Sequence, residues 1–316
     1  MQDLYGRTID YLRISVTDLC NFRCRYCMPA EGVTRRQHAE ILSFEELTEI
    51  AQAAAVCGIR KIRLTGGEPL VRRGIVSLCG QLAEIPGIHE LTMTTNGALL
   101  RAHAEALKAA GLSRVNLSLD TLDPGKFRRI TRGGSLADVL DGIDAALETG
   151  LTPLKLNTVL IRGFNDDEIP ILAGLTRRMP VTVRFIELMP VGCAKTAFPE
   201  GSLAASEVLQ SLPELMPAGS DGGVASLYKL PDACGQIGLI RPLSCSFCAS
   251  CNRIRLTSDG KLKPCLHSRS EYPLRGLHGT ELEQMIRTAV LEKPERHHMT
   301  ETGTSRSGRY MNEIGG

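Results

Sequence analysis

The stretch YLRISVTDLCNFRCRYC (residues 11–27) joins a strand pattern to three closely spaced cysteines. In its first part, polar Arg13 and Ser15 alternate with apolar residues, a period of two that is typical of a β-strand with one polar face. Similar segments recur along the chain, and stretches with helical periodicity lie between them. These further strand segments are residues 61–65, 90–95, 114–120, 154–161 and 181–188. Repeated strand and helix units favour a parallel sheet with right-handed crossovers.

Three of the intervening stretches carry the start and stop signals of α-helices. They are residues 43–58, 99–111 and 135–150, and each ends at a glycine, the usual residue after a helix C-terminus. Ser43 is followed three residues later by Glu46, which predicts a capping box at the start of the first helix.

One face of the predicted sheet is polar along its whole length. Parallel strands that helices cover on both faces, as in an open doubly wound sheet, normally show continuous apolar runs. Here the residues at every second position of each strand, which share one face of the sheet, are polar. Burying their side chains without hydrogen-bond partners would be costly. They are Arg13, Ser15, Lys61, Arg63, Thr65, Thr92, Thr94, Asn116, Ser118, Asp120, Lys155, Asn157, Thr182 and Arg184. We therefore expect an α/β fold, a partial (β/α)6 TIM-type barrel whose concave face lines a polar cavity. An antiparallel sheet with one solvated face is the alternative, which the intervening helices disfavour.

The chain changes character after residue 190, where Gly, Pro, Ser and Ala become frequent. Residues 217–223 (PAGSDGG) are expected to form an exposed loop. Two strands, a hairpin and a helix are predicted at residues 225–230, 235–240, 253–266 and 280–291. We divide the chain into a barrel domain, residues 1–224, and a C-terminal α+β domain, residues 225–316, that closes the open side of the barrel.

The composition argues against a general binder of nucleic acid or membranes. The 316 residues include 37 Lys and Arg against 35 Asp and Glu, and no Trp. Proteins that bind nucleic acid or membranes in general carry an excess of basic residues, which this chain lacks. Aromatic residues make up only 4% of the chain, which disfavours a surface on which bases stack. No segment approaches the roughly 18 apolar residues of a transmembrane helix. The first ten residues lack a signal-peptide pattern, so we expect a cytoplasmic location.

The eleven cysteines of such a chain indicate metal or cluster ligands, because disulfides are rare in the cytosol. Cys20, Cys24 and Cys27 lie within eight residues, with no fourth cysteine beside them. Thiolates bind zinc or iron-sulfur clusters. Three of them can hold three irons of a cubane and leave the fourth iron open, whereas zinc would need a fourth ligand from elsewhere. The spacing therefore favours an iron-sulfur cluster.

The segment around these cysteines, CNFRCRYC, resembles the signature of the radical S-adenosylmethionine (SAM) enzymes. The resemblance implies that the open iron of a [4Fe-4S] cluster binds SAM, which is cleaved to a 5′-deoxyadenosyl radical. TGGEP (residues 65–69) is similar to the GGEP segment of that family, which contacts the SAM amino group. The residues implied to bind SAM are Tyr26, Gly67, Ser118 and Met189.

A second group of cysteines lies near the C-terminus: Cys245, Cys248, Cys251 and Cys265. Four cysteines can form a closed tetrahedral zinc site, so a zinc ribbon is one interpretation. However, FCASCNRIRL with Cys265, RFIELMP and the final MNEIGG resemble the radical SAM GTP 3′,8-cyclases of molybdenum cofactor biosynthesis, and the likeness covers essentially the whole chain. It implies a second [4Fe-4S] cluster on Cys248, Cys251 and Cys265, whose open iron binds guanine. Cys245 is extra to this pattern and is expected not to be a ligand.

The polar face of the predicted sheet carries cations on separate strands. The chain has no G-x4-GK[ST] phosphate loop, so side chains would have to hold a triphosphate, for which the bidentate pairing of arginine is suited. At least one of these cations is expected to form an ordinary ion pair with Asp120 or Glu187. The resemblance implies a GTP site of Arg13, Arg63, Thr94, Lys155, Arg253 and Arg255, with Arg184 as a further candidate.

The resemblance also implies a reaction and its partners. The chain would be a lyase that converts GTP to (8S)-3′,8-cyclo-7,8-dihydroguanosine 5′-triphosphate, by hydrogen abstraction from C3′ and attack of the carbon radical on C8. The residues implied to assist catalysis are Arg253, Arg255, Gly315 and Gly316. The implied partners are a reductant protein and, downstream, a cyclic pyranopterin monophosphate synthase; a homodimer is left open.

Two other functions stay open on the residues alone. One is a radical SAM enzyme that modifies a peptide or another small molecule and uses a closed second cluster as an electron relay. The other is a zinc-stabilised binding module that does no chemistry. Metal content separates these functions, since two cubanes contain about eight irons with acid-labile sulfide.

Overall fold

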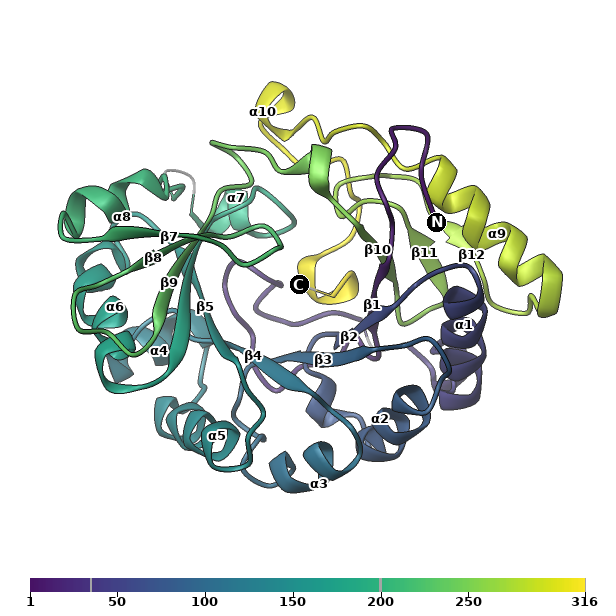
Figure 1. Ribbon diagram of the computed structural model, residues 1–316, viewed down its shortest axis with the longest axis horizontal. Coiled ribbons are helices and arrows are strands. Elements are labelled where there is room, and N and C mark those ends of the chain that lie inside the picture. Colours follow the sequence, from purple (N-terminus) through teal and green to yellow (C-terminus); the bar gives the residue numbers. More distant parts are fainter. Residues whose placement is uncertain (35, 199–200, 316) are drawn as a thin grey trace.

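The computed structural model describes residues 1–34, 36–198 and 201–315. Within these ranges the strands form one 12-stranded sheet in the order β12-β11-β10-β1-β2-β3-β4-β5-β6-β9-β8-β7. Strands β1 to β6 pair in parallel, as the sequence predicts. They span Tyr11–Ser15, Lys61–Thr65, Glu90–Thr95, Arg114–Ser118, Leu154–Leu160 and Val181–Glu187. The sheet curves around a central space without closing, so the partial barrel is confirmed (Figure 1).

Helices cover the convex face of the sheet, on the outside of the ring (Figure 1). The main ones are α1 (Phe44–Val56), α2 (Ile75–Ala83), α3 (Ala104–Ala109), α5 (Leu136–Glu148) and α6 (Ile169–Arg178). Shorter elements lie in the connections: η1 (His38–Glu40), η2 (Pro69–Val71), α4 (Pro124–Thr131), η3 (Asp166–Glu168), α7 (Ala194–Ala197), α8 (Ser206–Ser211) and α10 (Met299–Thr302). The apolar parity of the strands forms the core beneath the main helices, where Leu12, Ile62 and Met93 are buried. Across the described ranges, no helix combines the length and hydrophobicity that a membrane span requires.

The predicted helix starts are confirmed at α1 and wrong at α3. The Ser43 hydroxyl accepts from the Glu46 N–H at 3.1 Å, and the Glu46 carboxylate accepts from the Ser43 N–H at 2.7 Å, which is the capping box. The segment before α3 was expected to be helical from residue 99. It forms turns instead, in which the Leu100 carbonyl accepts from both His103 and Ala104.

The C-terminal residues extend the same sheet at both edges. At one edge β9 (Gln236–Ile240) pairs in parallel with β6, followed by β8 (Ser226–Lys229) and β7 (Met216–Ser220) in antiparallel pairing. At the other edge β10 (Arg253–Leu256) pairs in parallel with β1, followed by β11 (Lys261–Lys263) and β12 (Tyr272–Pro273). The helix α9 (Gly279–Leu291) contacts α1. The domain boundary at residue 224 falls in the turn between β7 and β8, and the division stays a prediction.

The prediction of an exposed loop at residues 217–223 is wrong for residues 217–220. Residues up to Ser220 belong to β7, although all five residues of this strand are exposed. Ala, Gly and Ser have little strand propensity, but backbone pairing with β8 overrides it. The remaining residues form the turn of the hairpin.

The C-terminal tail folds back into the centre of the ring (Figure 1). The Arg309 guanidinium pairs with Asp259 at 2.9 Å and with Glu271 at 2.7 Å. The element η5 (Met311–Glu313) follows, and its Asn312 donates to the Asp18 carbonyl at 3.0 Å. Ile314 is buried, Met311 half-buried and Tyr310 exposed. The tail is therefore docked on the barrel by ionic, polar and apolar contacts together.

We predict opposite stability effects for alanine at two helical glycines. In α5, a Cβ on Gly142 would lie 2.3 Å from the Gly97 carbonyl oxygen, whereas in α6 a Cβ on Gly174 would meet nothing within 4 Å. Alanine is favoured over glycine in helices by about 1 kcal/mol, but overpacking costs about 1–3 kcal/mol. Denaturant unfolding should therefore show Gly142→Ala destabilised and Gly174→Ala stabilised. A stabilised Gly142→Ala would contradict this packing of α5.

Candidate active site

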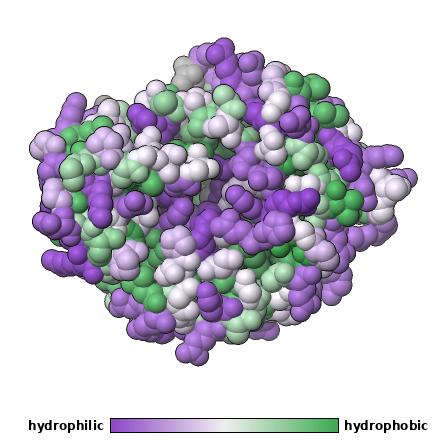
Figure 2. Space-filling view, in the orientation of Figure 1, coloured by the Kyte–Doolittle hydropathy of each residue, from purple (hydrophilic) through white to green (hydrophobic). Residues whose placement is uncertain are grey.

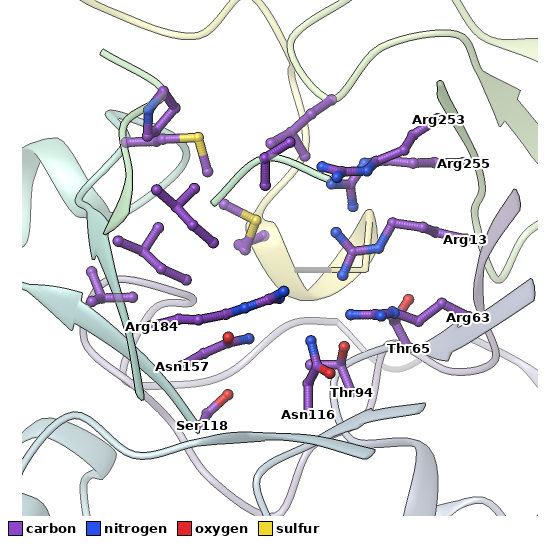
Figure 3. Close-up of a pocket in the computed structure, with 18 of the residues that line it drawn as sticks. Arg13, Arg63, Thr65, Thr94, Asn116, Ser118, Asn157, Arg184, Arg253 and Arg255 are labelled. Atoms are coloured by element: carbon purple, nitrogen blue, oxygen red, sulfur yellow. The ribbon is translucent and has the colours of Figure 1, made fainter. Parts of the chain in front are cut away.

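A cavity of about 540 Å³ lies at the centre of the ring, on the concave face of the sheet. Figure 2 shows the hollow surrounded mainly by hydrophilic residues. The polar parity of the strands lines it, and the side chains of Arg13, Arg63, Asn116 and Arg184 point toward its centre in Figure 3. Cysteines of both groups line this one cavity.

The first group of cysteines lies on the loop that follows β1. Cys20, Cys24 and Cys27 are half-buried and line the cavity. The Cys27 N–H donates to the Cys24 carbonyl at 2.9 Å, and the Arg23 N–H donates to the Thr131 carbonyl at 2.9 Å, which fixes the loop. Burial raises the pKa of Cys20 to about 11 and that of Cys27 to about 12. Binding to positive irons would offset the desolvation of these thiolates, so the donor set fits an iron-sulfur cluster.

Gly67 brings the loop after β2 against this cysteine loop. Its N–H donates to the Thr17 carbonyl at 2.8 Å, and a Cβ on Gly67 would lie 2.3 Å from the Leu19 carbonyl oxygen. Glycine is therefore required for the backbones to approach this closely. Gly67 also lines the cavity.

The other three residues implied to bind SAM also line the cavity. The Tyr26 hydroxyl donates to Asp120 at 2.7 Å. Burial raises the pKa of Asp120 to about 6, although hydrogen bonds from Val159 and Tyr26 oppose this rise. Ser118 is the last residue of β4, and Met189 follows β6. These residues lie on the same side of the fold as the first cysteines, and their cofactor roles stay predictions.

The second group of cysteines lies around β10 and β11. Cys248 begins η4 (Cys248–Ser250), Cys251 precedes β10 and Cys265 follows β11. All three line the cavity, whereas Cys245 is exposed and is not among the described lining residues. Within the described ranges, no three His, Cys, Asp or Glu side chains converge closely enough for a single metal ion, as a tetrahedral zinc site would require. A cubane places each cysteine on a separate iron, so it does not require the three thiols to converge on one point.

The second group of cysteines has cationic neighbours. Burial acts to raise the pKa of Cys248, but hydrogen bonding with His297 brings it down to about 7. Burial also acts to raise the pKa of Cys251, but the positive charge of Lys293 and hydrogen bonding lower it, and the net pKa is lowered. At Cys265 burial dominates and the pKa is raised, although Lys293 lowers it in part. A positive side chain therefore favours thiolates in this part of the cavity.

Basic side chains crowd the other wall of the cavity. Burial, together with nearby arginines, lowers the pKa of Arg63 and of Arg255 to about 10. Burial and the charges of Arg184 and Arg114 lower the pKa of Lys155 to about 8. These groups remain cationic at neutral pH, so they repel one another, and a polyanionic ligand would relieve that repulsion.

An ordinary ion pair was expected in the cavity, but its acidic partner is not the predicted one. Asp221, in the turn between β7 and β8, accepts from Lys155 at 3.2 Å and also pairs with Arg184. Asp120 instead accepts from Tyr26, and Glu187 accepts from the Leu243 N–H at 2.9 Å. The expectation of Asp120 or Glu187 as the partner is therefore wrong, because those carboxylates are used to hold loops.

Several buried polar atoms in the cavity wall have no hydrogen-bond partner in the described part of the chain. They are Thr94 Oγ1, Asn157 Oδ1, Arg184 Nε and Arg253 Nε, on β3, β5, β6 and β10. Buried polar groups are nearly always paired, and an unpaired one is costly. Figure 3 shows the four residues directed toward the same space. A ligand with several polar groups fits this wall.

The end of the tail lies against this wall. The Arg255 guanidinium donates to the Ile314 carbonyl at 3.1 Å and also contacts the Gly315 carbonyl. Gly315 has a φ of +69°, and a Cβ there would lie 2.1 Å from Thr65 Oγ1. Burial and the charge of Arg255 lower the pKa of Arg13 well below its usual value. Gly316 lies outside the described residues.

Sequence reasoning missed several lining residues. Arg114 pairs with Glu90 at 2.7 Å and lines the cavity; it has the same parity as Asn116, so the strand pattern was a usable signal. Tyr11, whose ring lies 5.6 Å from the Arg63 guanidinium, also shares the polar parity of its strand. Asp221 had no such signal, because its position depends on pairing of β7 with a distant segment.

Comparison with known proteins agrees with the cavity and its cysteines. The family model described as "Radical SAM superfamily" matches residues 14–175, and the model "Molybdenum Cofactor Synthesis C" matches residues 181–299. Among solved structures, Streptococcus suis SuiB bound to S-adenosylmethionine has a TM-score of 0.65 at 15% identity and covers 97% of this chain and 77% of its own. At that identity the likeness concerns the fold alone.

Relatives of known name are similar along the whole chain. A GTP 3′,8-cyclase of Alkaliphilus oremlandii is 49% identical over 320 residues and covers all of both chains. A GTP 3′,8-cyclase of Peptoclostridium acidaminophilum is 52% identical and covers 99% of this chain and 98% of its own. Iron-sulfur clusters and SAM are the cofactors of this kind of enzyme, and the thiols and polar wall described above fit them. The chain therefore belongs to the GTP 3′,8-cyclase family of radical SAM enzymes.

Proposed function

We propose that this chain is a GTP 3′,8-cyclase that forms (8S)-3′,8-cyclo-7,8-dihydroguanosine 5′-triphosphate from GTP. The observation that carries the proposal is that both cysteine groups and the cationic wall line one cavity of about 540 Å³. A reaction between two groups of one nucleotide needs them held in a fixed geometry, shielded from water.

The first group of cysteines would hold a [4Fe-4S] cluster with one open iron. When bound, this cluster and SAM supply a 5′-deoxyadenosyl radical that removes the hydrogen atom from C3′ of GTP. The protein would orient SAM through Tyr26, Gly67, Ser118 and Met189, all of which line the same cavity as the first cysteines. Gly67 keeps the backbone close to that loop, since any side chain would meet the Leu19 carbonyl.

The second group would hold another [4Fe-4S] cluster on Cys248, Cys251 and Cys265. With only three protein ligands, one iron of such a cluster would remain open to the guanine base. The exposure of Cys245 supports its omission from the ligand set. The position of this group, in the cavity and near Arg253, supports a role in binding substrate rather than a relay remote from it.

The cationic wall would hold the triphosphate. Arg13, Arg63, Lys155 and Arg184 face one space from separate strands, and Thr94 offers there a buried hydroxyl that has no hydrogen-bond partner among the described residues. Burial is the main cause of the lowered pKa values of these bases, and repulsion between them adds to it; a bound anion would offset both. Charge-assisted bonds from several arginines are among the strongest available to phosphate.

Arg253, Arg255 and the tail would position the reacting part of the nucleotide. The Arg255 guanidinium is oriented by the Ile314 and Gly315 carbonyls, so the tail holds it in one direction. Arg253 has a buried Nε without a partner in the described residues. Gly315 and Gly316, the latter outside the described residues, are proposed to assist catalysis.

The wider biological setting is proposed from the family alone. A reductant protein would supply electrons, and a cyclic pyranopterin monophosphate synthase would take the product onward. The enzyme would work in the cytoplasm, as a monomer or a homodimer.

The overall test is an anaerobic incubation of the chain with reductant, SAM and each nucleoside triphosphate in turn. We expect 5′-deoxyadenosine and a cyclised nucleotide with GTP alone. Turnover of a peptide without any nucleotide product would instead support the peptide-modifying alternative.

We predict that Cys248→Ala keeps part of the reductive cleavage of SAM but ends GTP conversion, because guanine loses its iron. Cys245→Ala is the matched control and should keep full iron content and most activity. Iron analysis and product chromatography of both variants check this prediction. Loss of about half of the iron from Cys245→Ala would show that Cys245 is a ligand after all.

We predict that deleting Gly315 and Gly316 leaves iron content and GTP affinity unchanged but lowers product formation by about a hundredfold, because Arg255 loses its orientation. Gly315→Ala should have a similar effect, since its Cβ would lie 2.1 Å from Thr65 Oγ1. The control is Gly308→Ala, where a Cβ meets nothing within 4 Å. Normal product formation by the truncated chain would mean that the tail is dispensable.

We predict that Asp221→Asn tightens GTP binding, because its carboxylate competes with phosphate for Lys155 and Arg184. The side chains of these pairs are only 9–13% exposed, so water screens the competition less than at the surface, where such pairs are worth about 0.2–1 kcal/mol, and the dissociation constant should fall by about fivefold or more. Calorimetry with GTP measures this change, and guanosine, which has no phosphate, should bind equally to both proteins. Asp144→Asn, on the exposed face of α5, is the control. Weaker GTP binding by Asp221→Asn would show that Asp221 orients the two cations instead.

A further inference from the structure

Lys293 is a buried lysine that lies two residues after the end of α9. The residue is 2% exposed, and its Nζ donates to the Arg253 carbonyl at 2.8 Å and to the Pro264 carbonyl at 2.7 Å. Within the ranges that the structure describes, no carboxylate forms an ion pair with it. Lys263, which is equally buried, differs in this respect because it pairs with Glu271 at 3.1 Å.

A buried cation without an anionic partner is costly, and two carbonyl dipoles offset only part of that cost. Lys293 lines the central cavity together with Cys248, Cys251 and Cys265. Its charge acts on the thiols of Cys251 and Cys265. The compensating negative charge for this ammonium would therefore come from the cysteine ligands of the second group once they hold a cluster.

The carbonyls that Lys293 holds are next to the proposed ligands in the chain. Arg253 lies two residues after Cys251, and Pro264 directly precedes Cys265. One ammonium therefore fastens the start of β10 to the end of β11, and with them two of the three ligand segments.

Arg7 fastens the third ligand segment in the same way. Its guanidinium, which pairs with Asp3, donates to the Cys248 carbonyl at 2.9 Å. It also donates to the Pro294 and Glu295 carbonyls at 2.8 Å each. Since these residues follow Lys293 directly, the two buried cations link all three ligand segments through one short stretch of chain.

We propose that Lys293 is a positioning residue and the counter-charge of the second iron-sulfur cluster. Its two hydrogen bonds hold the Cys251 and Cys265 segments at the spacing the cluster needs. Its fixed positive charge stabilises the reduced cluster, which carries one more negative charge, and so raises the reduction potential. This inference rests on the proposed assignment of Cys248, Cys251 and Cys265 as ligands.

The test uses the full chain carrying Cys20→Ala, Cys24→Ala and Cys27→Ala, so that the second cluster is the one measured. Lys293→Gln keeps a hydrogen-bond donor without the charge, Lys293→Met removes both, and Lys293→Arg keeps the charge. The control is Lys229→Met, at an exposed lysine of β8. The readouts are iron and sulfide content, circular dichroism of the cluster-free chain, and a redox titration followed by electron paramagnetic resonance.

We expect Lys293→Gln to load iron and to show a more negative potential, while Lys293→Arg and Lys229→Met match the parent. Lys293→Met should also lose iron, with an unchanged circular dichroism spectrum. A potential in Lys293→Gln equal to that of the parent, at full iron content, would overturn the counter-charge role. Full iron content in Lys293→Met would overturn the positioning role. A parent chain without iron and sulfide would instead refute the second cluster itself.

Discussion

The fold depends on one constraint: six parallel strands carry polar side chains on a single face. Those groups cannot be buried against helices, so helices cover the other face and the sheet curves around the polar one. The result is a cavity whose wall consists of residues at alternating positions of the strands. Three cysteines of the first group and three of the second also line that space: Cys20, Cys24, Cys27, Cys248, Cys251 and Cys265.

Electrostatics then define what the cavity can bind. Burial, together with the charges of neighbouring arginines, lowers the pKa values of Arg63 and Lys155, and Asp221 is a partial partner of Lys155. Buried atoms such as Thr94 Oγ1 and Asn157 Oδ1 lack partners in the described residues. A triphosphate nucleotide would supply both the missing charge and the missing hydrogen bonds. The clusters that the cysteines at the cavity wall would hold would supply the radical SAM chemistry of this family.

The sequence predicted the barrel, its strands and the start of α1 because these depend on local periodicity and capping. It also identified the cysteines and the strand cations, which short motifs and parity reveal. Asp221 and Lys293 were not predicted. Asp221 reaches the cavity through the pairing of β7 with β8 and β9, and Lys293 reaches the second cysteine group because α9 ends beside β10 and β11. Such long-range contacts leave no local pattern. The late start of α3 has a local cause instead, since residues 98–103 form turns in which the Leu100 carbonyl accepts from the N–H groups of His103 and Ala104.

The central claim is that this one cavity brings C3′ of GTP to the site where SAM is cleaved. It is tested most directly by anaerobic turnover with GTP deuterated at C3′, followed by mass spectrometry of the 5′-deoxyadenosine formed. We predict that this product carries deuterium from GTP. Unlabelled 5′-deoxyadenosine, formed at the same rate with and without GTP, would contradict the account.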